Sequence, residues 1–391
     1  MSTIHWIGAG LSAVPGIRRL IANQHRLVLW NRTLARAEQA VEGLQGDYTV
    51  AAFAFDKLAG RLNERDIVIS MLPADWHLKL AELCLQKKAH FVSSSYISDE
   101  MRVLHNPARD QGLCLVNEVG LDPGIDHLFA HALMHDYRAS KDFSPANQHY
   151  FRSYCGGFPK VPNDFRYKFS WSPLGVLKAL KSPARSIRDG EILETRHPWD
   201  AISDYETTLP HGSESFQAYP NRDSLPFMAD YGFAEDWDVQ EFVRGTLRLP
   251  GWSAAWADIF SEVESLEGES GQKRLVEMSE ELWKTQSYQA GEADRVVLAV
   301  ELEVRDKPSG KTVWHRSFAL DAAGDERGSA MARLVSTPVS YAVEAVKQGS
   351  IGAGVSAAPS DPGLVKTWLD QLRQDGESFE LIDFCQESTG S

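Results

Sequence analysis

Three small residues near the start of the chain, Gly8, Gly10 and Ala13, have the spacing of a phosphate-binding turn. Gly8 permits a tight turn, Gly10 lets the backbone approach a pyrophosphate, and Ala13 lets the following helix pack closely on the preceding strand. The N-terminus of that helix then faces the anion. Leu11 and Ser12 lie inside the same turn, so we expect all five residues to contact a dinucleotide. The alternative is a plain turn from strand to helix.

The residues at the end of the next expected strand, Asn31, Arg32 and Thr33, indicate which dinucleotide binds. A site for NAD places an acidic residue there, about 20 residues after the glycines, to hold the ribose 2′-hydroxyl. This chain has no acid at that place. Arg32 can instead bind a 2′-phosphate with its guanidinium fork, and Thr33 can donate a hydroxyl hydrogen bond. We therefore expect NADP, with NAD as the alternative if Arg32 is only a solvated residue at a helix start.

Asp122 is the first candidate for proton transfer. It follows an expected strand at its carboxyl end, the edge at which doubly wound sheets bind their ligands. A carboxylate at that edge can act as a general base. The alternative is that Asp122 only caps the turn before Pro123. We expect Asp126 to cap the next helix and His127 to be a packed or solvated histidine.

A parallel sheet is needed to bring these residues to one edge. Short apolar runs that read as strands lie at residues 4–7, 27–30, 67–71, 90–92 and 113–116. Helical segments separate them, and this alternation is typical of a parallel sheet that is covered by helices on both faces. The first 120 or so residues therefore predict a doubly wound α/β fold.

Composition limits the partners of the chain. The 391 residues are 43% hydrophobic and 24% charged, which suits two globular domains or one large one. No stretch approaches the roughly 18 apolar residues of a membrane span, so we expect no membrane contact. The net charge of −14 argues against nucleic acid. The cysteines have neither CxxC spacing nor a nearby histidine cluster, so we expect no metal site, no disulfide framework and a cytoplasmic location. They are Cys84, Cys114, Cys155 and Cys385.

Six motifs follow one another in a fixed order, at residues 94–98, 116–127, 153–157, 167–172, 219–224 and 244–248. In sequence and in order they resemble the signature stretches of the saccharopine dehydrogenase family, in particular its fungal-type saccharopine reductases. The likeness covers most of residues 1–250 and resumes more weakly from Glu292 to Met331. Several ordered motifs are far more specific than a glycine-rich turn alone.

The resemblance implies an α/β protein with a Rossmann-like doubly wound parallel sheet and an inserted α/β substrate domain. The expected boundaries are 1–122 for the dinucleotide-binding domain, 123–329 for the substrate domain, and 330–391 for a segment that returns to pack on the first domain. Two departures from the family pattern put cleft closure and substrate scope in doubt. The segment 252–290 is shorter than the corresponding segment of fungal members, and residues 321–328 are charged where the family has a glycine-rich loop.

The activity that the resemblance implies is an NADP-dependent reaction in lysine and amino-acid metabolism. The family interconverts saccharopine with glutamate and α-aminoadipate semialdehyde through an imine, by transfer of a hydride to or from the carbon bonded to nitrogen. The expected partners are therefore small-molecule substrates, and a homodimer is the expected assembly. The sequence indicates neither the physiological direction nor whether lysine is made or degraded.

Site residues in the first domain also follow from the resemblance. Leu72 and His77 belong to a segment that resembles a cofactor-contacting loop of the family, although His77 can equally face solvent. Ser95 and Tyr96 are expected to donate hydrogen bonds to the substrate. Asp122 is expected to contact the secondary amine or to orient the hydrolytic water.

Arginines of the second domain are expected to hold the three carboxylates of saccharopine. Arg222 and Arg244 each lie in a family-like motif and can bind a carboxylate with two parallel hydrogen bonds. The alternative is that each forms an ordinary surface or structural ion pair. Cys155 and Trp171 are expected to form pocket walls, although an aromatic residue in such a strand is more often part of the core.

Three functions remain open from the sequence. The first is saccharopine dehydrogenase activity. The second is an imine reductase like carboxynorspermidine dehydrogenase, whose cationic amine partner needs an acidic pocket rather than arginines. The third is a regulator that binds NADP without turnover.

Overall fold

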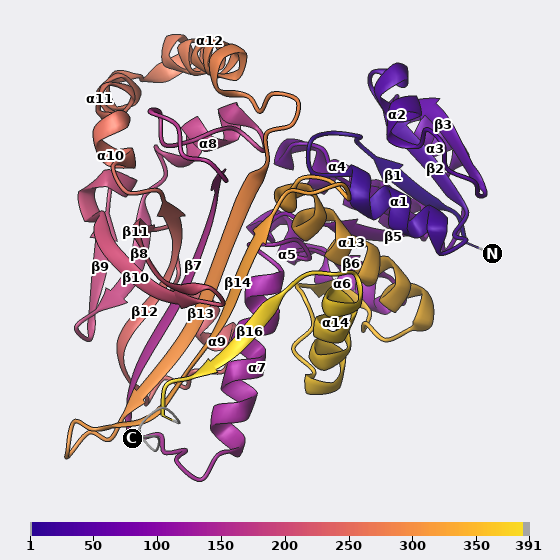
Figure 1. Ribbon diagram of the computed structural model, residues 1–391. Helices are drawn as coiled ribbons and strands as arrows, with labels where there is room; N and C mark the ends of the chain where they lie inside the picture. The colour runs from indigo at the N-terminus through magenta and orange to yellow at the C-terminus, as the bar shows by residue number, and fades with distance from the viewer. Residues whose placement is uncertain (1, 386–391) are drawn as a thin grey trace. The chain divides into compact units, whose positions relative to one another are not determined.

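Residues 2–385 are described by a computed structural model, drawn in Figure 1, and they form two compact units. The first unit runs to Leu128 and includes Glu326–Gln374. The second comprises Phe129–Asp325 and the described part of the segment that begins at Asp375. The expected boundaries, after residues 122 and 329, therefore differ from the observed ones by a few residues. None of the described helices is long and apolar enough to span a lipid bilayer.

The first unit is built on a seven-stranded sheet that is parallel throughout, with the order β15-β6-β5-β4-β1-β2-β3. Its strands are β1 (Ile4–Ile7), β2 (Leu27–Asn31), β3 (Tyr48–Ala52), β4 (Ile67–Ser70), β5 (His90–Ser93), β6 (Cys114–Val116) and β15 (Gly354–Ser356). The chain leaves β1 toward β2 on one side and resumes at β4 on the other. The point between β1 and β4 is thus the switch point at which such sheets bind ligands.

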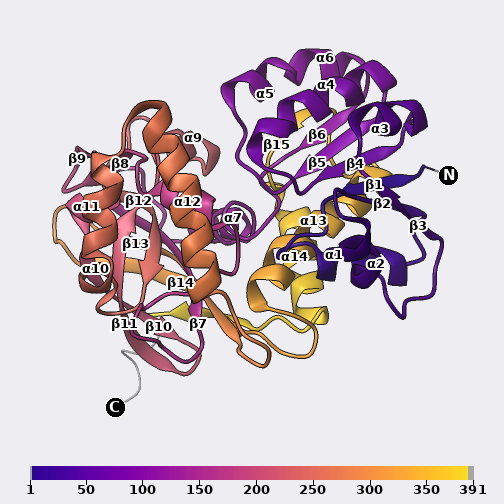
Figure 2. The same cartoon turned by 90° about the horizontal axis from the view of Figure 1, so that it is seen from above.

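Helices cover both faces of this sheet. They are α1 (Val14–Ala22), α2 (Leu34–Ala40), α3 (Phe55–Arg61), α4 (His77–Lys87), α5 (Asp99–Val103), α6 (His105–Asp110), α13 (Ala330–Gln348) and α14 (Pro362–Gln374), with a short 3-10 helix at Ala74–Trp76. Figure 2 shows α4, α5 and α6 on one side and α1, α13 and α14 on the other. Because both faces are covered, β1 and β4 are buried along their whole length.

The contact between α1 and α13 joins the two separate segments of the first unit. A Cβ atom added at Gly16 would lie 2.3 Å from the carbonyl oxygen of Ser336, so only glycine permits this approach. Farther along, Glu344 accepts hydrogen bonds from Arg19 at 2.9 Å and from Asn23 at 2.7 Å. His25 Nε2 lies 3.3 Å from the same carboxylate.

We expect Glu344→Gln to destabilise the first unit in a pH-dependent manner. Burial acts to raise the pKa of Glu344, but the hydrogen bonds from His25, Asn23 and Arg19 outweigh it and bring the pKa to about 2, from an ordinary 4.5. A depressed carboxyl pKa contributes stability above pH 4.5 that is lost as the pH falls toward 2. At pH 7 the substitution should lower the free energy of unfolding by about 2 to 3 kcal/mol.

Urea unfolding of wild type and variant from pH 7 down to pH 3 measures this effect. The difference between them should narrow as the pH falls below about 4.5. The exposed Glu42 provides a matched control, because Glu42→Gln should change stability little at any pH. A difference that stays constant over the whole range would show that Glu344 acts through packing rather than through charge.

The second unit is built on a mixed sheet with the order β10-β11-β12-β7-β13-β14-β16, and β8 and β9 continue it beside β12. Its strands are β7 (Gln148–Pro159), β8 (Ala184–Arg188), β9 (Glu191–Thr195), β10 (Ser203–Leu209), β11 (Gly212–Pro220), β12 (Asp238–Arg248), β13 (Asp294–Arg305), β14 (Thr312–Ala323) and β16 (Phe379–Asp383). Only β7 and β12 pair in parallel; the other pairs named here are antiparallel.

Several helices complete the second unit. They are α8 (Pro173–Ala179), α9 (Pro226–Asp230), α10 (Trp252–Ala255), α11 (Ala257–Ser265) and α12 (Gly268–Gln286), with a 3-10 helix at Pro198–Ala201; α7 (Ile125–Ala139) crosses from the first unit into the second. The strand β16 pairs with β14. The segment 330–391 was expected to return entirely to the first domain, but its strand β16 belongs to the second sheet.

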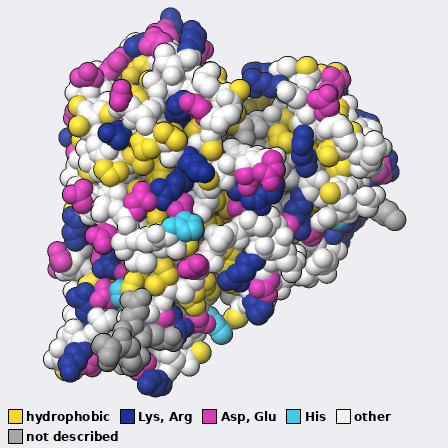
Figure 3. Space-filling model, viewed as in Figure 1, with side chains coloured by type: hydrophobic (Ala, Val, Ile, Leu, Met, Phe, Trp, Pro, Cys, Tyr) yellow, Lys and Arg dark blue, Asp and Glu magenta, His cyan; other side chains and the backbone are white. Residues whose placement is uncertain are grey.

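On the face shown in Figure 3, acidic and basic side chains are interspersed rather than separated by sign.

Candidate functional site

The glycine turn joins β1 to α1 at the switch point of the first sheet. Gly8 has a φ of +105°, which other residues rarely adopt, and a Cβ atom there would lie 3.1 Å from the carbonyl oxygen of Met71. Gly10 has no atom within 4 Å of an added Cβ, so its outer side is open to a ligand. Ser12 is half-buried and Leu11 is exposed, whereas Ala13 is buried directly before α1. These residues fit a pyrophosphate above the helix N-terminus.

The side chain of Asn31 fixes this turn from the end of β2. Its amide oxygen accepts a hydrogen bond from the backbone of Ala9 at 3.1 Å, and its amide nitrogen donates to the carbonyl of Thr33 at 2.8 Å. Asn31 therefore holds the glycine turn and the start of α2 together. Close packing of α1 on its neighbours depends on Gly16 as well as Ala13. Gly16, three residues after Ala13, was not predicted from the sequence.

Arg32 and Thr33 are both exposed just beyond β2. Among residues 2–385, Arg32 forms no ion pair, so its guanidinium is available to a ligand phosphate. An acidic side chain, which would repel a 2′-phosphate, is absent from positions 31–33. The residues present thus fit NADP.

Arg32→Ala should weaken NADP(H) binding and leave NAD(H) binding almost unchanged. A charge-assisted hydrogen bond contributes about 1.5 to 3 kcal/mol, which corresponds to a roughly 10- to 150-fold loss of affinity. Fluorescence titration measures the dissociation constants of NADPH and NADH. Arg36→Ala, an exposed arginine on α2, is the matched control. An equal loss for both cofactors would show that Arg32 does not contact the 2′-phosphate.

His77 does not face solvent, and that alternative was wrong. It is buried at the start of α4, with Nδ1 3.0 Å from the hydroxyl of Ser70 and Nε2 2.8 Å from the hydroxyl of Ser95. Burial lowers its pKa to about 4, so His77 is neutral at pH 7. Leu72 is half-buried and packs against the core of this unit. Contacts of both residues with the cofactor stay a prediction.

Tyr96 and Asp122 lie together beyond the carboxyl ends of β5 and β6. The Tyr96 hydroxyl donates a hydrogen bond to Asp122 Oδ1 at 3.2 Å, and both residues are half-buried. The Asp122–Pro123 peptide bond is cis. A tyrosine hydroxyl next to a carboxylate can pass a proton to and from a reacting group. The first unit therefore brings Ser95, Tyr96 and Asp122 together at one edge of its sheet.

Asp126 and His127 at the start of α7 are buried rather than solvated. Asp126 Oδ1 accepts a hydrogen bond from the backbone of Gly124 at 2.6 Å. His127 Nε2 lies 3.0 Å from a carboxylate oxygen of Glu118, which is also buried. Glu118 was not predicted as a site residue from the sequence. Its position shortly before Asp122 could have indicated a role, but a single glutamate at that position does not form a recognisable motif.

In the second unit, Arg244 lies on β12, within an apolar environment. It is buried, and its guanidinium carbon lies 3.9 Å from the centre of the Phe227 ring. Cys155 on β7 pairs in register with Thr246, two residues after Arg244, so the three side chains share one face of the sheet. A cation on an aromatic ring beside a thiol and a hydroxyl can bind a carboxylate.

Arg222 follows β11, and residues on either side of it form hydrogen bonds with the backbone of Arg244 on β12. The amide of Asn221 donates to the carbonyl of Arg244 at 2.9 Å, and the amide of Arg244 donates to the Ser224 hydroxyl at 3.0 Å. Arg222 itself is exposed, with a φ of +59°. The structure thus brings the two predicted arginines to neighbouring positions on β12 and its adjoining loop.

Trp171 is not part of the core, because 38% of its surface is exposed. It packs over Gly175 of α8, where an added Cβ would lie 2.6 Å from its ring. Its assignment to the substrate pocket stays a prediction. The neighbouring Lys168 forms an ion pair with Glu292.

Arg248 is a buried cation that the sequence argument missed. It lies on the same face of β12 as Arg244, and aromatic rings surround its guanidinium carbon at 5.0 to 5.5 Å. These rings belong to Tyr167, Tyr219 and Trp252. The spacing of four residues was the available signal, because residues i and i+4 of a strand share one face.

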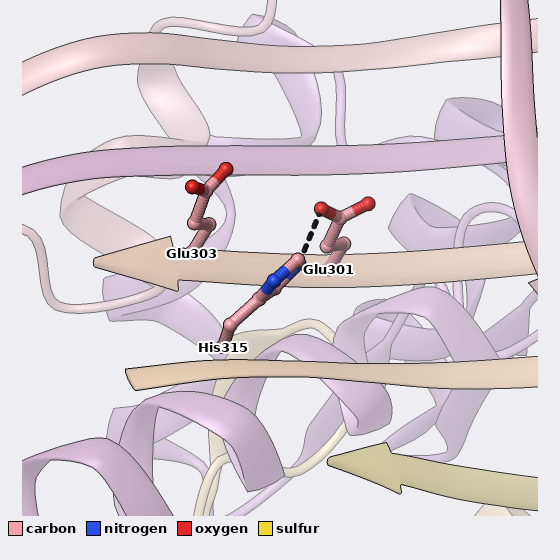
Figure 4. A group of neighbouring side chains, drawn as sticks. All are labelled: Glu301, Glu303 and His315. Carbon is pink, nitrogen blue, oxygen red and sulfur yellow. Dashed lines mark hydrogen bonds and ion pairs between the residues drawn. The ribbon is translucent and has the colours of Figure 1, made fainter. Parts of the chain in front are cut away.

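Glu301 and Glu303 on β13 and His315 on β14 form a cluster with the geometry of a metal site (Figure 4). His315 Nε2 lies 2.8 Å from Glu301, and Arg152 donates to Glu301 at 2.8 Å and lies 3.5 Å from Glu303. Burial acts to raise the pKa of Glu301, but its hydrogen bond with His315 and the charge of Arg152 hold that pKa below its ordinary value. The guanidinium already occupies the place of a cation, so the cluster is an ion-pair network.

Comparisons with known proteins match both units. Residues 4–116 match the family model described as "Saccharopine dehydrogenase NADP binding domain", and residues 120–377 match "Saccharopine dehydrogenase C-terminal domain". The saccharopine dehydrogenase [NADP(+), L-glutamate-forming] of Pyricularia oryzae is 27% identical, over 94% of this chain and 96% of its own length. The protein of the same description from Saccharomyces cerevisiae is 36% identical, over 63% of this chain and 54% of its own.

Solved structures agree with the sequence comparison. Apo saccharopine dehydrogenase (L-Glu forming) from Saccharomyces cerevisiae superposes with a TM-score of 0.79 at 26% identity. The superposition covers 98% of this chain and 100% of that one. The similarity therefore extends over both units.

Proposed function

The chain belongs to the saccharopine dehydrogenase family, and from this we propose that it is an NADP-dependent oxidoreductase that acts on the C–N bond of saccharopine. It interconverts saccharopine with glutamate and α-aminoadipate semialdehyde through an imine. The observation that carries this proposal is the match of both units, in order and over nearly the whole chain, to proteins of that description.

NADP supplies the hydride acceptor when it is bound. The residues that would hold it are those of the glycine turn, Gly8 to Ala13, together with Asn31, Arg32 and Thr33. The open space at Gly10 admits the pyrophosphate, and Arg32 binds the 2′-phosphate. Leu72 and His77 lie on the next connection after the switch point and complete the cofactor side of the site.

Asp122 manages the proton of the substrate amine. In the direction of saccharopine oxidation, a hydride leaves the carbon of the lysine-derived side chain that is bonded to nitrogen, and Asp122 accepts the N–H proton as the C=N bond forms. Water then adds to the imine carbon, and the C–N bond breaks to release glutamate and the semialdehyde. The Tyr96 hydroxyl donates to Asp122 and thereby orients the carboxylate.

Arg222 and Arg244 hold substrate carboxylates through their guanidinium forks. The Phe227 ring packs against the Arg244 guanidinium and restricts its rotamers, so less entropy is lost when a carboxylate binds. Cys155 lies on the same sheet face as Arg244 and forms the adjoining wall. Ser95 and Trp171 complete the substrate contacts in this proposal.

The direct test is oxidation of saccharopine by the purified full chain. We expect saccharopine-dependent reduction of NADP, with glutamate formed in equal amount, and a lower rate with NAD. Mass spectrometry of the amine product distinguishes glutamate from lysine. No reduction with either cofactor, or lysine as the amine product, would contradict the proposal. A homodimer and a cytoplasmic location stay predictions, to be tested by sedimentation and by microscopy of tagged protein.

A further inference from the structure

We propose that Glu118 is a positioning residue that keeps the Tyr96 hydroxyl on Asp122. This inference rests on the proposed roles of Tyr96 and Asp122 in proton transfer. Glu118 follows β6 and lies between the two segments that carry these residues. It binds the segment that contains Tyr96 on one side and the start of α7, directly after the Asp122 turn, on the other.

Glu118 holds both neighbours of Tyr96. Its backbone amide donates to the carbonyl of Ser95 at 3.1 Å, and its Oε1 accepts a hydrogen bond from the amide of Ile97 at 2.8 Å. Because Ser95 and Ile97 flank Tyr96, these two bonds fix the backbone from which the tyrosine ring projects. The Ser95 hydroxyl is held separately by His77, at 2.8 Å.

The other carboxylate oxygen of Glu118 binds the start of α7. Oε2 lies 3.0 Å from His127 Nε2. His127 Nδ1 in turn lies 3.9 Å from Asp126, whose second oxygen accepts the backbone amide of Gly124 at 2.6 Å. Glu118, His127 and Asp126 therefore form one chain of contacts from the Tyr96 segment to the turn that begins at Asp122.

The conformation of Glu118 supports a specific role. It is 3% exposed and has a φ of +55°, a backbone region that favours glycine. A buried carboxylate is tolerated only where hydrogen bonds satisfy it. Such strain at a buried charged residue, beside a proton-transferring pair, is typical of functional sites. Glycine would relax the backbone at position 118 but would lose both side-chain contacts.

A double-mutant cycle with Tyr96 tests whether Glu118 acts through the tyrosine. Glu118→Gln keeps the shape of the side chain but replaces one of its two accepting oxygens with an amide nitrogen that donates. We expect this variant to lower kcat by roughly 10- to 100-fold, because a small displacement of a reacting group has effects of that size. In a Tyr96→Phe background the same substitution should change kcat by less than about threefold. NADPH affinity should stay within about threefold throughout.

Amide hydrogen exchange gives a second readout that does not depend on turnover. Residues 95–97 should exchange roughly tenfold faster in Glu118→Gln than in wild type. Glu42→Gln, at an exposed carboxylate of the same unit, should leave both this exchange and kcat unchanged. An equal loss of kcat in the wild-type and Tyr96→Phe backgrounds, or unchanged exchange at residues 95–97, would overturn the inference. Inactivity of the wild type on saccharopine would count against the proposed function, while the exchange result still decides the role of Glu118.

Discussion

Arg244→Ala and Arg222→Ala should each lower kcat/KM for saccharopine by roughly 30- to 1000-fold, or about 2 to 4 kcal/mol. In the proposed complex each guanidinium pairs with a substrate carboxylate, and its removal would leave that carboxylate unpaired in a partly dehydrated site. Arg244 should have the larger effect, because it is 4% exposed and lies against Phe227, whereas Arg222 is exposed. Steady-state kinetics with saccharopine and saturating NADP measure the loss.

Lysine at either position should restore little activity, because a point charge cannot reproduce two parallel hydrogen bonds. The matched control is Arg188→Ala, an exposed arginine on β8, which should keep wild-type kinetics. Thermal unfolding of Arg244→Ala separates lost binding from lost folding, since Arg244 is also buried. Unchanged kcat/KM in folded variants would show that these arginines form only structural contacts.

Asp122→Asn should lower kcat by about 10² or more, while NADPH affinity stays within a few-fold. Asparagine keeps the size of the side chain and an oxygen that can accept from the Tyr96 hydroxyl, so the 3.2 Å contact survives. It cannot accept the proton of the amine. The experiment therefore separates proton transfer from turn geometry.

Asp99→Asn, at an exposed carboxylate on α5, is the control for Asp122→Asn and should leave kcat unchanged. The pH dependence of kcat/KM adds an independent measurement, because an ionisation that belongs to Asp122 should disappear from the profile of the variant. If kcat survives in Asp122→Asn, Asp122 only caps its turn and another group transfers the proton.

Local sequence patterns were sufficient for β1, β2, β4, β5 and β6 of the first sheet, because buried parallel strands are short apolar runs. They were insufficient for β3 and β15. Tyr48–Ala52 is a half-exposed edge strand, and Gly354–Ser356 has three residues and pairs with β6 from far along the chain. Strand β16 was likewise missed, because only its long-range pairing with β14 defines it.

The candidate site shows the same limit. The open side of Gly10 and the exposure of Arg32 fit expectations that rest on adjacent residues. The contacts of His77 with Ser70 and Ser95, and that of Glu118 with His127, join segments that only the fold brings together. For such residues a sequence identifies the side chain but not its partner, so solvent exposure was one of the options for His77.

The charge of the amine partner tests the central claim most directly. NADPH oxidation is measured with glutamate plus α-aminoadipate semialdehyde, and in parallel with putrescine plus the semialdehyde that matches it. A site that binds carboxylates through Arg222 and Arg244 should reduce the glutamate imine and leave putrescine unreacted. Arg244→Ala should lower the rate of the glutamate reaction, by roughly 30- to 1000-fold, without creating the putrescine reaction. Robust reduction with putrescine and none with glutamate would contradict the assignment of this chain to saccharopine.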